Sequence, residues 1–286
     1  MDMLRPILLT RPESGLSAWK ARFDPMHLPV LADTAMALEE WRANEDAVDA
    51  HLLSETIVRD PLMTLKVFSH LARATRRGSW DDARGDAETV TAALVMLGIG
   101  PFFRSFGAQA KAEDWLAGTP GALEGFTAVL RRSHRAAAFS LAFAVHRMDH
   151  DAAVLHAAAL LHDFAELLIW LHAPALALQV AQRLRTSPGL RTVQAQREIL
   201  NVELPELQQA LMQAWRLPSL LVHITDDRQG EDPQVRNVQL AIRLARHSAG
   251  GWDDPALPDD VHDVAQLLQL GEVPVRRLLA EIDQEA

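Results

Sequence analysis

The stretch HLLSETIVRDPLMTLKVFSHLA, residues 51–72, decides the fold class. Its apolar residues, such as Ile57 and Leu65, recur at intervals of three and four, which is the spacing of a helix with one buried face. Between the two runs, Asp60 and Pro61 fit a helix start, because aspartate accepts backbone N–H groups there and proline lacks an N–H that would have no partner in the helix. The stretch therefore predicts two consecutive helices.

The same spacing recurs along the chain, and alternating Val/Ile/Thr runs with Asn-Gly or Asp-Gly turns are absent. We therefore expect an all-α protein with two helical lobes. The glycine-rich break at 118–121 marks the boundary between them. The predicted divisions are a poorly packed N-terminal arm (1–22), an N-terminal helical lobe (23–117) and a second helical lobe with C-terminal helices (118–286).

The composition limits the function classes. Among the 286 residues, 28 Lys and Arg stand against 38 Asp and Glu, a net charge of −10, which argues against bulk binding of nucleic acid. There is no cysteine, which excludes thiol catalysis, disulfides and cysteine-based zinc sites. The apolar stretch near the N-terminus is too short for a signal peptide, and no run approaches the roughly 18 apolar residues of a membrane span. We expect a soluble cytoplasmic protein with no membrane partner.

The stretch LLHDFAELLIW, residues 160–170, places His162 and Asp163 side by side in an apolar run. One interpretation is a buried polar pair that hydrogen-bonds neighbouring helices, because unpaired polar groups in a core are destabilising. The other is an ion site. On a continuous helix Glu166 would lie on the same face as His162, and with His134 these side chains could supply three or four ligands.

Several stretches, in order, resemble the HDOD domain, a bacterial signalling relative of the metal-dependent HD phosphohydrolases. Each has its counterpart among the conserved segments of that family, and together they run from about residue 27 to 222. They are HLPVLADTAMALEEW (27–41), ETIVRDPLMTLKVFSHL (55–71), TVTAALVMLGIGPFFRSF (89–106), LLHDFAE (160–166) and LQQALMQAWRLPSLLV (207–222). The resemblance implies an all-α regulatory domain with a two-lobed, multi-helix HDOD/HD-like fold.

The resemblance also implies where a metal site would lie. Catalytic HD enzymes bind their metal with a first histidine, the His-Asp pair and a later aspartate, which correspond here to His134, to His162 and Asp163, and to position 242. The residue at that last position is Ile242, whose side chain has no electron pair to donate. The ligand set is therefore incomplete, and His134, His162 and Asp163 are vestigial metal-ligand candidates.

Two further departures from the catalytic pattern agree with this. Ala165 and Glu166 stand where HD enzymes have Gly-Lys, so a cation that could meet phosphate is replaced by an anion. After the stretch that ends at residue 222, where many family members carry His-His, the chain has His223 followed by Asp226 and Asp227. A second metal would therefore lack its imidazoles as well.

The leading hypothesis is a noncatalytic signalling module that acts through contacts with other signalling proteins, and a homodimer is compatible with it. No catalytic residue and no cofactor are expected, apart from weak divalent metal at the vestigial ligands. One alternative is a metal-dependent phosphohydrolase acting on a nucleotide or cyclic dinucleotide. Another is a nucleotide-binding sensor without turnover, which would need a basic pocket built from Arg131, Arg132 or Arg135.

Overall fold

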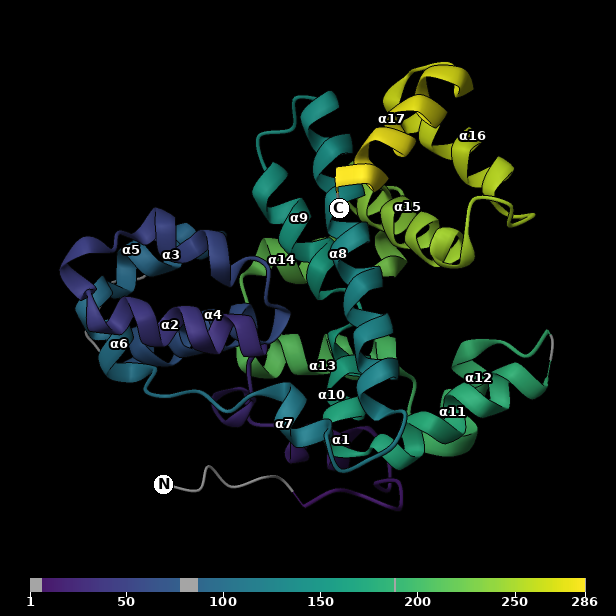
Figure 1. Ribbon diagram of the computed structural model, residues 1–286. Coiled ribbons are helices and arrows are strands. Elements are labelled where there is room, and N and C mark those ends of the chain that lie inside the picture. The colour runs from purple at the N-terminus through teal and green to yellow at the C-terminus, as the bar shows by residue number, and fades with distance from the viewer. Residues whose placement is uncertain (1–6, 78–86, 188, 286) are drawn as a thin grey trace. The chain divides into compact units, whose positions relative to one another are not determined.

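Helices dominate the computed structural model, which describes residues 7–77, 87–187 and 189–285 (Figure 1). These residues include no β-strand, and the β-bridge found among them joins Val30 to Lys111. The predicted all-α fold is confirmed. It follows from the three-and-four spacing of apolar residues, which gives each helix a face to bury.

Contacts along the backbone divide the chain into two compact units, each built from two separate stretches. Unit 1 consists of Met1–Thr127 and Asp163–Pro218, and unit 2 of Ala128–His162 and Ser219–Ala286. This division differs from the two consecutive lobes expected from the sequence. The physical reason is that helices far apart in the chain pack together, as when α1 contacts α13 within unit 1.

Unit 1 contains most of the shorter helices. In Figure 1, α2 to α5 form one group, in which α5 contacts both α3 and α4. A second group joins α10 to α7, α11 and α13. The helices of this unit are α1 (Leu16–Arg22), η1 (Pro25–His27), α2 (Ala32–Ala43), η2 (Glu45–Ala47), α3 (Ala50–Ile57), α4 (Pro61–Arg77), α5 (Val90–Leu97), α6 (Ile99–Ser105), α7 (Ala112–Leu116), α10 (Phe164–His172), α11 (Pro174–Thr186), α12 (Thr192–Leu200) and α13 (Leu204–Trp215).

The expectation of a poorly packed arm is wrong for its last third, because α1 is part of the core of unit 1. Trp19 is fully buried, and its indole N–H donates to the backbone oxygen of Leu200 at 2.7 Å. A single tryptophan buries enough apolar surface to fix a short helix whose other residues show little periodicity. Residues 1–6 of the expected arm lie outside the described residues.

The predicted start of α4 is confirmed and anchors a second segment. Asp60 is fully buried, and one carboxylate oxygen accepts the backbone N–H groups of Leu62 at 2.8 Å and Met63 at 3.0 Å. The other oxygen accepts the backbone N–H of Leu31, immediately before α2, at 2.8 Å. One side chain therefore caps its own helix and holds the entry of another.

A buried lysine lies one turn further along α4. The Nζ of Lys66 donates to the backbone oxygen of Leu28 and to Oε1 of Gln109, each at 2.6 Å. Burial lowers the pKa of Lys66 to about 8, although the charge of Asp60 opposes the shift. Burial raises the pKa of Asp60, although the backbone N–H groups that donate to its carboxylate act to lower it. The buried side chains of Asp60 and Lys66 therefore hold the segment that leads into α2 through polar contacts at Leu28 and Leu31.

Unit 2 carries the longer helices and the C-terminal part of the chain. Within it α9 contacts α14 and α15, α15 packs on α16, and α16 packs on α17 (Figure 1). A buried hydrogen bond of 2.9 Å joins Ser140 to Asn237 and so ties α8 to α15. The helices of this unit are most of α8 (Ala122–His146), α9 (Ala152–Leu161), α14 (Ser219–Ile224), η3 (Asp227–Gln229), α15 (Pro233–His247), η4 (Ser248–Gly250), α16 (Leu257–Leu268) and α17 (Glu272–Glu285).

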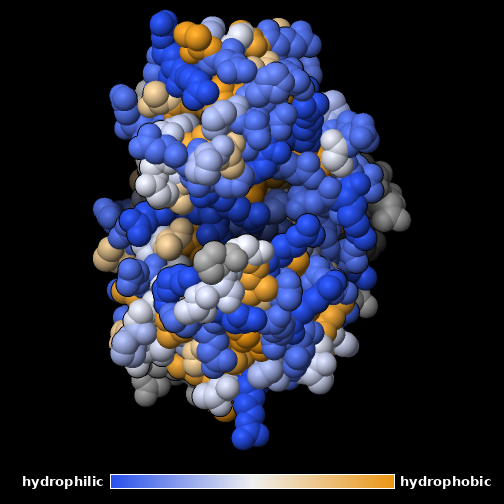
Figure 2. Space-filling model, turned by 90° about the vertical axis from the view of Figure 1, so that its right-hand side faces the viewer, coloured by the Kyte–Doolittle hydropathy of each residue, from blue (hydrophilic) through white to orange (hydrophobic). Residues whose placement is uncertain are grey.

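The segment Ala152–His172 is long and apolar enough to cross a membrane by length and composition, with a mean hydropathy of 1.5. Of its most apolar window, 78% is buried inside the protein, as is typical of a core segment. Hydrophilic side chains predominate on the face of the molecule drawn in Figure 2, where hydrophobic residues form several small groups.

Candidate functional site

The His-Asp pair lies at a break in the helical chain, where α9 ends and α10 begins. His162 is the C-cap of α9, and Asp163 precedes Phe164, the first residue of α10, with φ −110° and ψ 20°. The expectation that one helix runs through the pair is therefore wrong. His162 and Glu166 belong to different helices, so they do not share the helix face on which the four-ligand interpretation depended.

The imidazole of His162 faces a carboxylate that comes from a distant part of unit 2. Its Nε2 lies 3.1 Å from Oδ1 of Asp227, at the start of η3. The His162 side chain is 7% exposed and that of Asp227 is 52% exposed, so a buried imidazole is paired with a carboxylate at the surface. Burial would raise the pKa of Asp227, but hydrogen bonds to His162 and Gln239 and the charge of Arg246 hold it below its ordinary value.

Position 242 lies beside this pair. Ile242 is 3% exposed and lines the same pocket as His162 and Asp227. The placement agrees with the expectation that residue 242 faces the remnant of the HD site. The carboxylate that meets His162 is nevertheless supplied by Asp227.

His134 lies on α8, where its charge acts on His156 of α9. The pKa of His156 is lowered to about 4, mainly by burial and also by the charge of His134. Within residues 7–77, 87–187 and 189–285, no three His, Asp or Glu side chains gather into a group that could hold a metal ion. Weak metal binding at the vestigial ligands His134, His162 and Asp163 stays a prediction.

His162 lines a pocket of about 560 Å³ within unit 2, called the α15 pocket below. One face of α15 forms a wall of it, and the loop around η3, His162 at the end of α9 and one residue of α16 complete it. Most of its lining is charged or polar. The lining residues are His162, Asp227, Gly230, Glu231, Arg236, Gln239, Leu240, Ile242, Arg243, Arg246 and Asp263.

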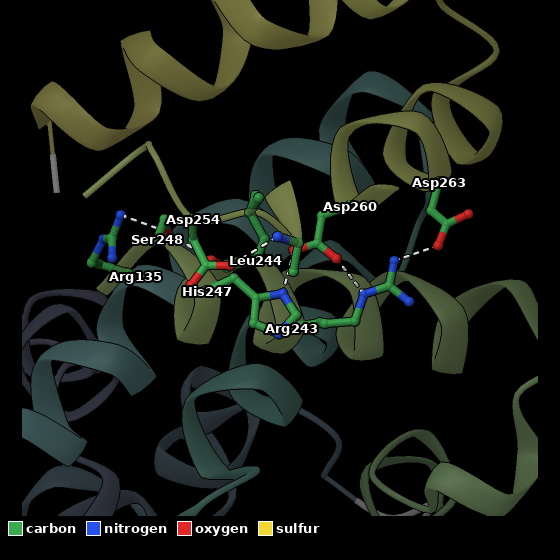
Figure 3. A network of polar contacts seen from close by, with 9 residues as sticks. Arg135, Arg243, Leu244, His247, Ser248, Asp254, Asp260 and Asp263 are labelled. Atoms are coloured by element: carbon green, nitrogen blue, oxygen red, sulfur yellow. Dashed lines mark hydrogen bonds and ion pairs between the residues drawn. The ribbon is translucent and has the colours of Figure 1, made fainter. Parts of the chain in front are cut away.

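A network of ion pairs fixes the side of this pocket toward α16 (Figure 3). Arg243 donates from Nε to Oδ1 of Asp260 at 2.6 Å and from Nη2 to Asp263. Asp260 is almost fully buried, and its other oxygen lies 2.6 Å from Nδ1 of His247. Partial burial would lower the pKa of Arg243, but Asp263 and Asp260 raise it above its ordinary value. Arg243 is therefore held as a cation.

The arginine that the sensor hypothesis placed beside His134 has a different role. Arg135 donates from Nε to Asp283 of α17 at 2.7 Å. Its Nη2 donates to the hydroxyl of Ser248 at 2.9 Å (Figure 3). Asp283 also accepts the indole N–H of Trp252 at 3.0 Å. Arg135 thus ties α17 to α8. The α15 pocket has other arginines, and neither Arg135 nor its neighbours at 131 and 132 line it.

In the sequence, Asp227 is one of the residues found where many family members carry His-His. The signal that could have identified it was its position, since it follows the stretch ending at residue 222 where family members carry His-His. An acidic residue there lies near the His-Asp pair in space, and an acid beside a histidine is a natural hydrogen-bond partner. The arginines of α15 gave no comparable signal, because arginines on a helix usually face solvent.

The comparisons with known proteins agree with this fold. The family model of the HDOD domain matches residues 28–229. The MmoQ response regulator of Methylococcus capsulatus str. Bath is similar in structure, with a TM-score of 0.66 and 20% identity over 88% of this chain and 98% of that one. A virulence factor of Campylobacter jejuni subsp. jejuni has a TM-score of 0.56 and 18% identity over 85% of this chain and 84% of that one. No match was found among curated proteins. On the extent of the family match, the chain belongs to the HDOD domain family.

Proposed function

We propose that this protein is a noncatalytic regulatory module that transmits a signal through contacts with other proteins. The observation that carries the proposal is the state of the HD pair. The Nε2 of His162 is hydrogen-bonded to Asp227 at 3.1 Å, and an isoleucine occupies the position where catalytic relatives need a carboxylate ligand. A hydrolytic metal needs several hard donors around an open coordination position, and these side chains do not provide them.

Membership of the HDOD family supports a signalling role, and the structurally similar MmoQ protein is itself a response regulator. The sign of the charge after the His-Asp pair supports the absence of phosphoester chemistry, since Glu166 stands where a lysine would meet phosphate. The alternative is a metal-dependent phosphohydrolase. In that case metal binding would have to rearrange the contact between His162 and Asp227.

Elemental analysis of the purified protein, combined with an assay on model phosphodiesters, tests the proposal. We expect well under one equivalent of divalent metal and no hydrolysis after manganese or magnesium is added. A catalytic HD phosphohydrolase in the same assay serves as the positive control. Stoichiometric metal with turnover that disappears in His162→Gln, but persists in a variant of the exposed His150, would overturn the proposal.

A further inference from the structure

The second half of α8 exposes an apolar face. Leu141 and Val145 are exposed, and so is Met148 just after the helix ends. Ala138 and Ala142, which are partly exposed, belong to the same face, because residues three and four apart are neighbours on a helix. All of these residues lie in unit 2. A continuous row of exposed apolar side chains is typical of a surface that another protein covers.

Met148 has a backbone conformation that favours glycine. Its φ is +56°, and it ends α8 in a Schellman motif. In this motif the N–H of Met148 donates to the backbone oxygen of Val145 at 3.0 Å, and the N–H of Asp149 donates to that of Ala144 at 2.9 Å. Glycine is usual at the left-handed position because it has no Cβ. Met148 is 83% exposed, so the fold itself gives no reason for a large apolar side chain there.

The apolar face has opposite charges at its two ends. Arg131 is exposed near the middle of α8, ten residues before Leu141. Asp151 lies ten residues after Leu141 and accepts the side-chain amide of Gln234 at 2.8 Å, a neutral donor that leaves its negative charge in place. An antiparallel second copy would bring each Arg131 to the Asp151 of the other copy. A parallel copy would bring like charges together.

We infer that the exposed face of α8 binds a second copy of this chain, with the two α8 helices antiparallel about a twofold axis near Leu141. Val145 of each copy then packs over Ala138 of the other, whose small side chain lets the helices approach closely. Each contact occurs twice, as in any interface formed by the same surface of two identical chains. Arg147 and Asp149 pair with each other within each copy at 3.1 Å, so they do not oppose the contact.

The size of this face limits the strength of the dimer. A standard stable interface buries about 800 Å² per partner, which is more than one face of a single helix covers. The dimer should therefore be weak, with a dissociation constant of about 10–100 µM. The inference does not depend on the proposed function, because a catalytic or a noncatalytic protein could form such a dimer.

Sedimentation equilibrium of the full chain at about 5–500 µM, a range that includes this dissociation constant, tests the inference. Val145→Glu should weaken dimerisation at least about tenfold, because it places a charge at the centre of the interface. Val95→Glu is the matched control. This valine of α5 is exposed to a similar extent, 67% against 63% for Val145, and belongs to unit 1. The control should dimerise like the unmodified chain.

Charge reversal tests the antiparallel arrangement. Arg131→Asp gives each copy two acidic ends, and Asp151→Arg gives each copy two basic ends. Each variant alone should dimerise about tenfold more weakly, because like charges then meet at both ends of the interface. An equimolar mixture of the two variants should form heterodimers as tightly as the unmodified chain dimerises, because both end contacts then join opposite charges.

Each outcome has a definite meaning. Weaker dimerisation of Val145→Glu, together with recovery in the mixture of charge variants, is the expected result. A full chain that stays monomeric at the highest concentration overturns the inference, since the face then has another occupant. Dimerisation that Val145→Glu leaves unchanged, or that Val95→Glu weakens equally, overturns it too. A mixture that associates no more tightly than the single variants overturns it as well. Circular dichroism of each variant confirms that the fold is retained.

Discussion

The substitution Ile242→Asp would place a carboxylate where catalytic HD enzymes have one. Ile242 is 3% exposed, so the change removes a buried aliphatic group and introduces a charge next to the pocket. Large-to-small changes of buried aliphatic residues cost about 2–5 kcal/mol, and a buried carboxylate without a partner adds to this cost. Because the side chain lines a pocket that water can enter, we expect a loss of about 3–5 kcal/mol in the free energy of unfolding.

The same substitution should create a response to metal. The new carboxylate would join His162 and Asp227, which already lie 3.1 Å apart, to make three donors of the types that divalent ions accept. An ion that binds only the folded protein stabilises it by about 2.7 kcal/mol at about 100 times its dissociation constant. Manganese should therefore restore much of the lost stability of Ile242→Asp and leave the unmodified protein unchanged.

Urea unfolding with and without manganese measures both effects. Ile242→Asn is the matched control, because asparagine has nearly the same shape as aspartate but no carboxylate. This variant should lose stability, and manganese should not restore it. If manganese stabilises Ile242→Asp no more than Ile242→Asn, residue 242 does not belong to the remnant of the HD site. If manganese stabilises the unmodified protein by a similar amount, the noncatalytic proposal must be abandoned.

Three further predictions concern stability. Asp60→Ala should lower the free energy of unfolding by about 3–5 kcal/mol, because it removes a fully buried carboxylate that accepts backbone N–H groups from two segments. Asp49→Ala, which removes an exposed helix cap, should lower it by about 1 kcal/mol. Equal losses in urea unfolding would contradict this reasoning. His162→Ala should cost about 1–3 kcal/mol, since it leaves a buried space and removes a partner of a half-exposed carboxylate, and an unchanged melting temperature would show that the pair is not structural. Burial lowers the pKa values of His156 and His172 from 6.5 to about 4. Between pH 6.5 and 4 the unfolded chain therefore binds more protons than the folded one. The free energy of unfolding should fall as the pH falls through this range, by up to about 3 kcal/mol for each histidine. Urea unfolding at several pH values in that window checks it, and a flat profile would mean that both side chains are solvated.

Much of the fold could be predicted from local features. Helical spacing gave the all-α class, and Asp60 with Pro61 marked the start of α4, because both signals depend only on neighbours in the chain. The division into units could not be predicted in the same way, since it depends on contacts between distant helices. The packing of Trp19 against Leu200 is one such contact, and nothing within residues 1–22 indicates it.

The sequence pointed to residue types for the candidate site but not to its geometry. Through the family pattern it marked His162 and Asp163 as candidates and Ile242 as a residue without a donor. It could not show that the helix breaks at the pair, because the apolar run continues through it on both sides. Nor could it show that Asp227 reaches His162, which depends on how η3 packs against the end of α9 within unit 2.

The break at His162 and Asp163 also bears on how the segment Ala152–His172 is distinguished from a membrane span during synthesis. The pair lies at the middle of this 21-residue stretch, where a charged side chain opposes insertion most strongly. An aspartate at the centre of a candidate span disfavours insertion by about 2.5–3.5 kcal/mol, while a leucine favours it by several tenths. The segment has the length and composition of a membrane span even with the pair present, so leucine at both positions would only make it more apolar. The polar pair therefore opposes insertion of a segment that is mostly buried inside the protein.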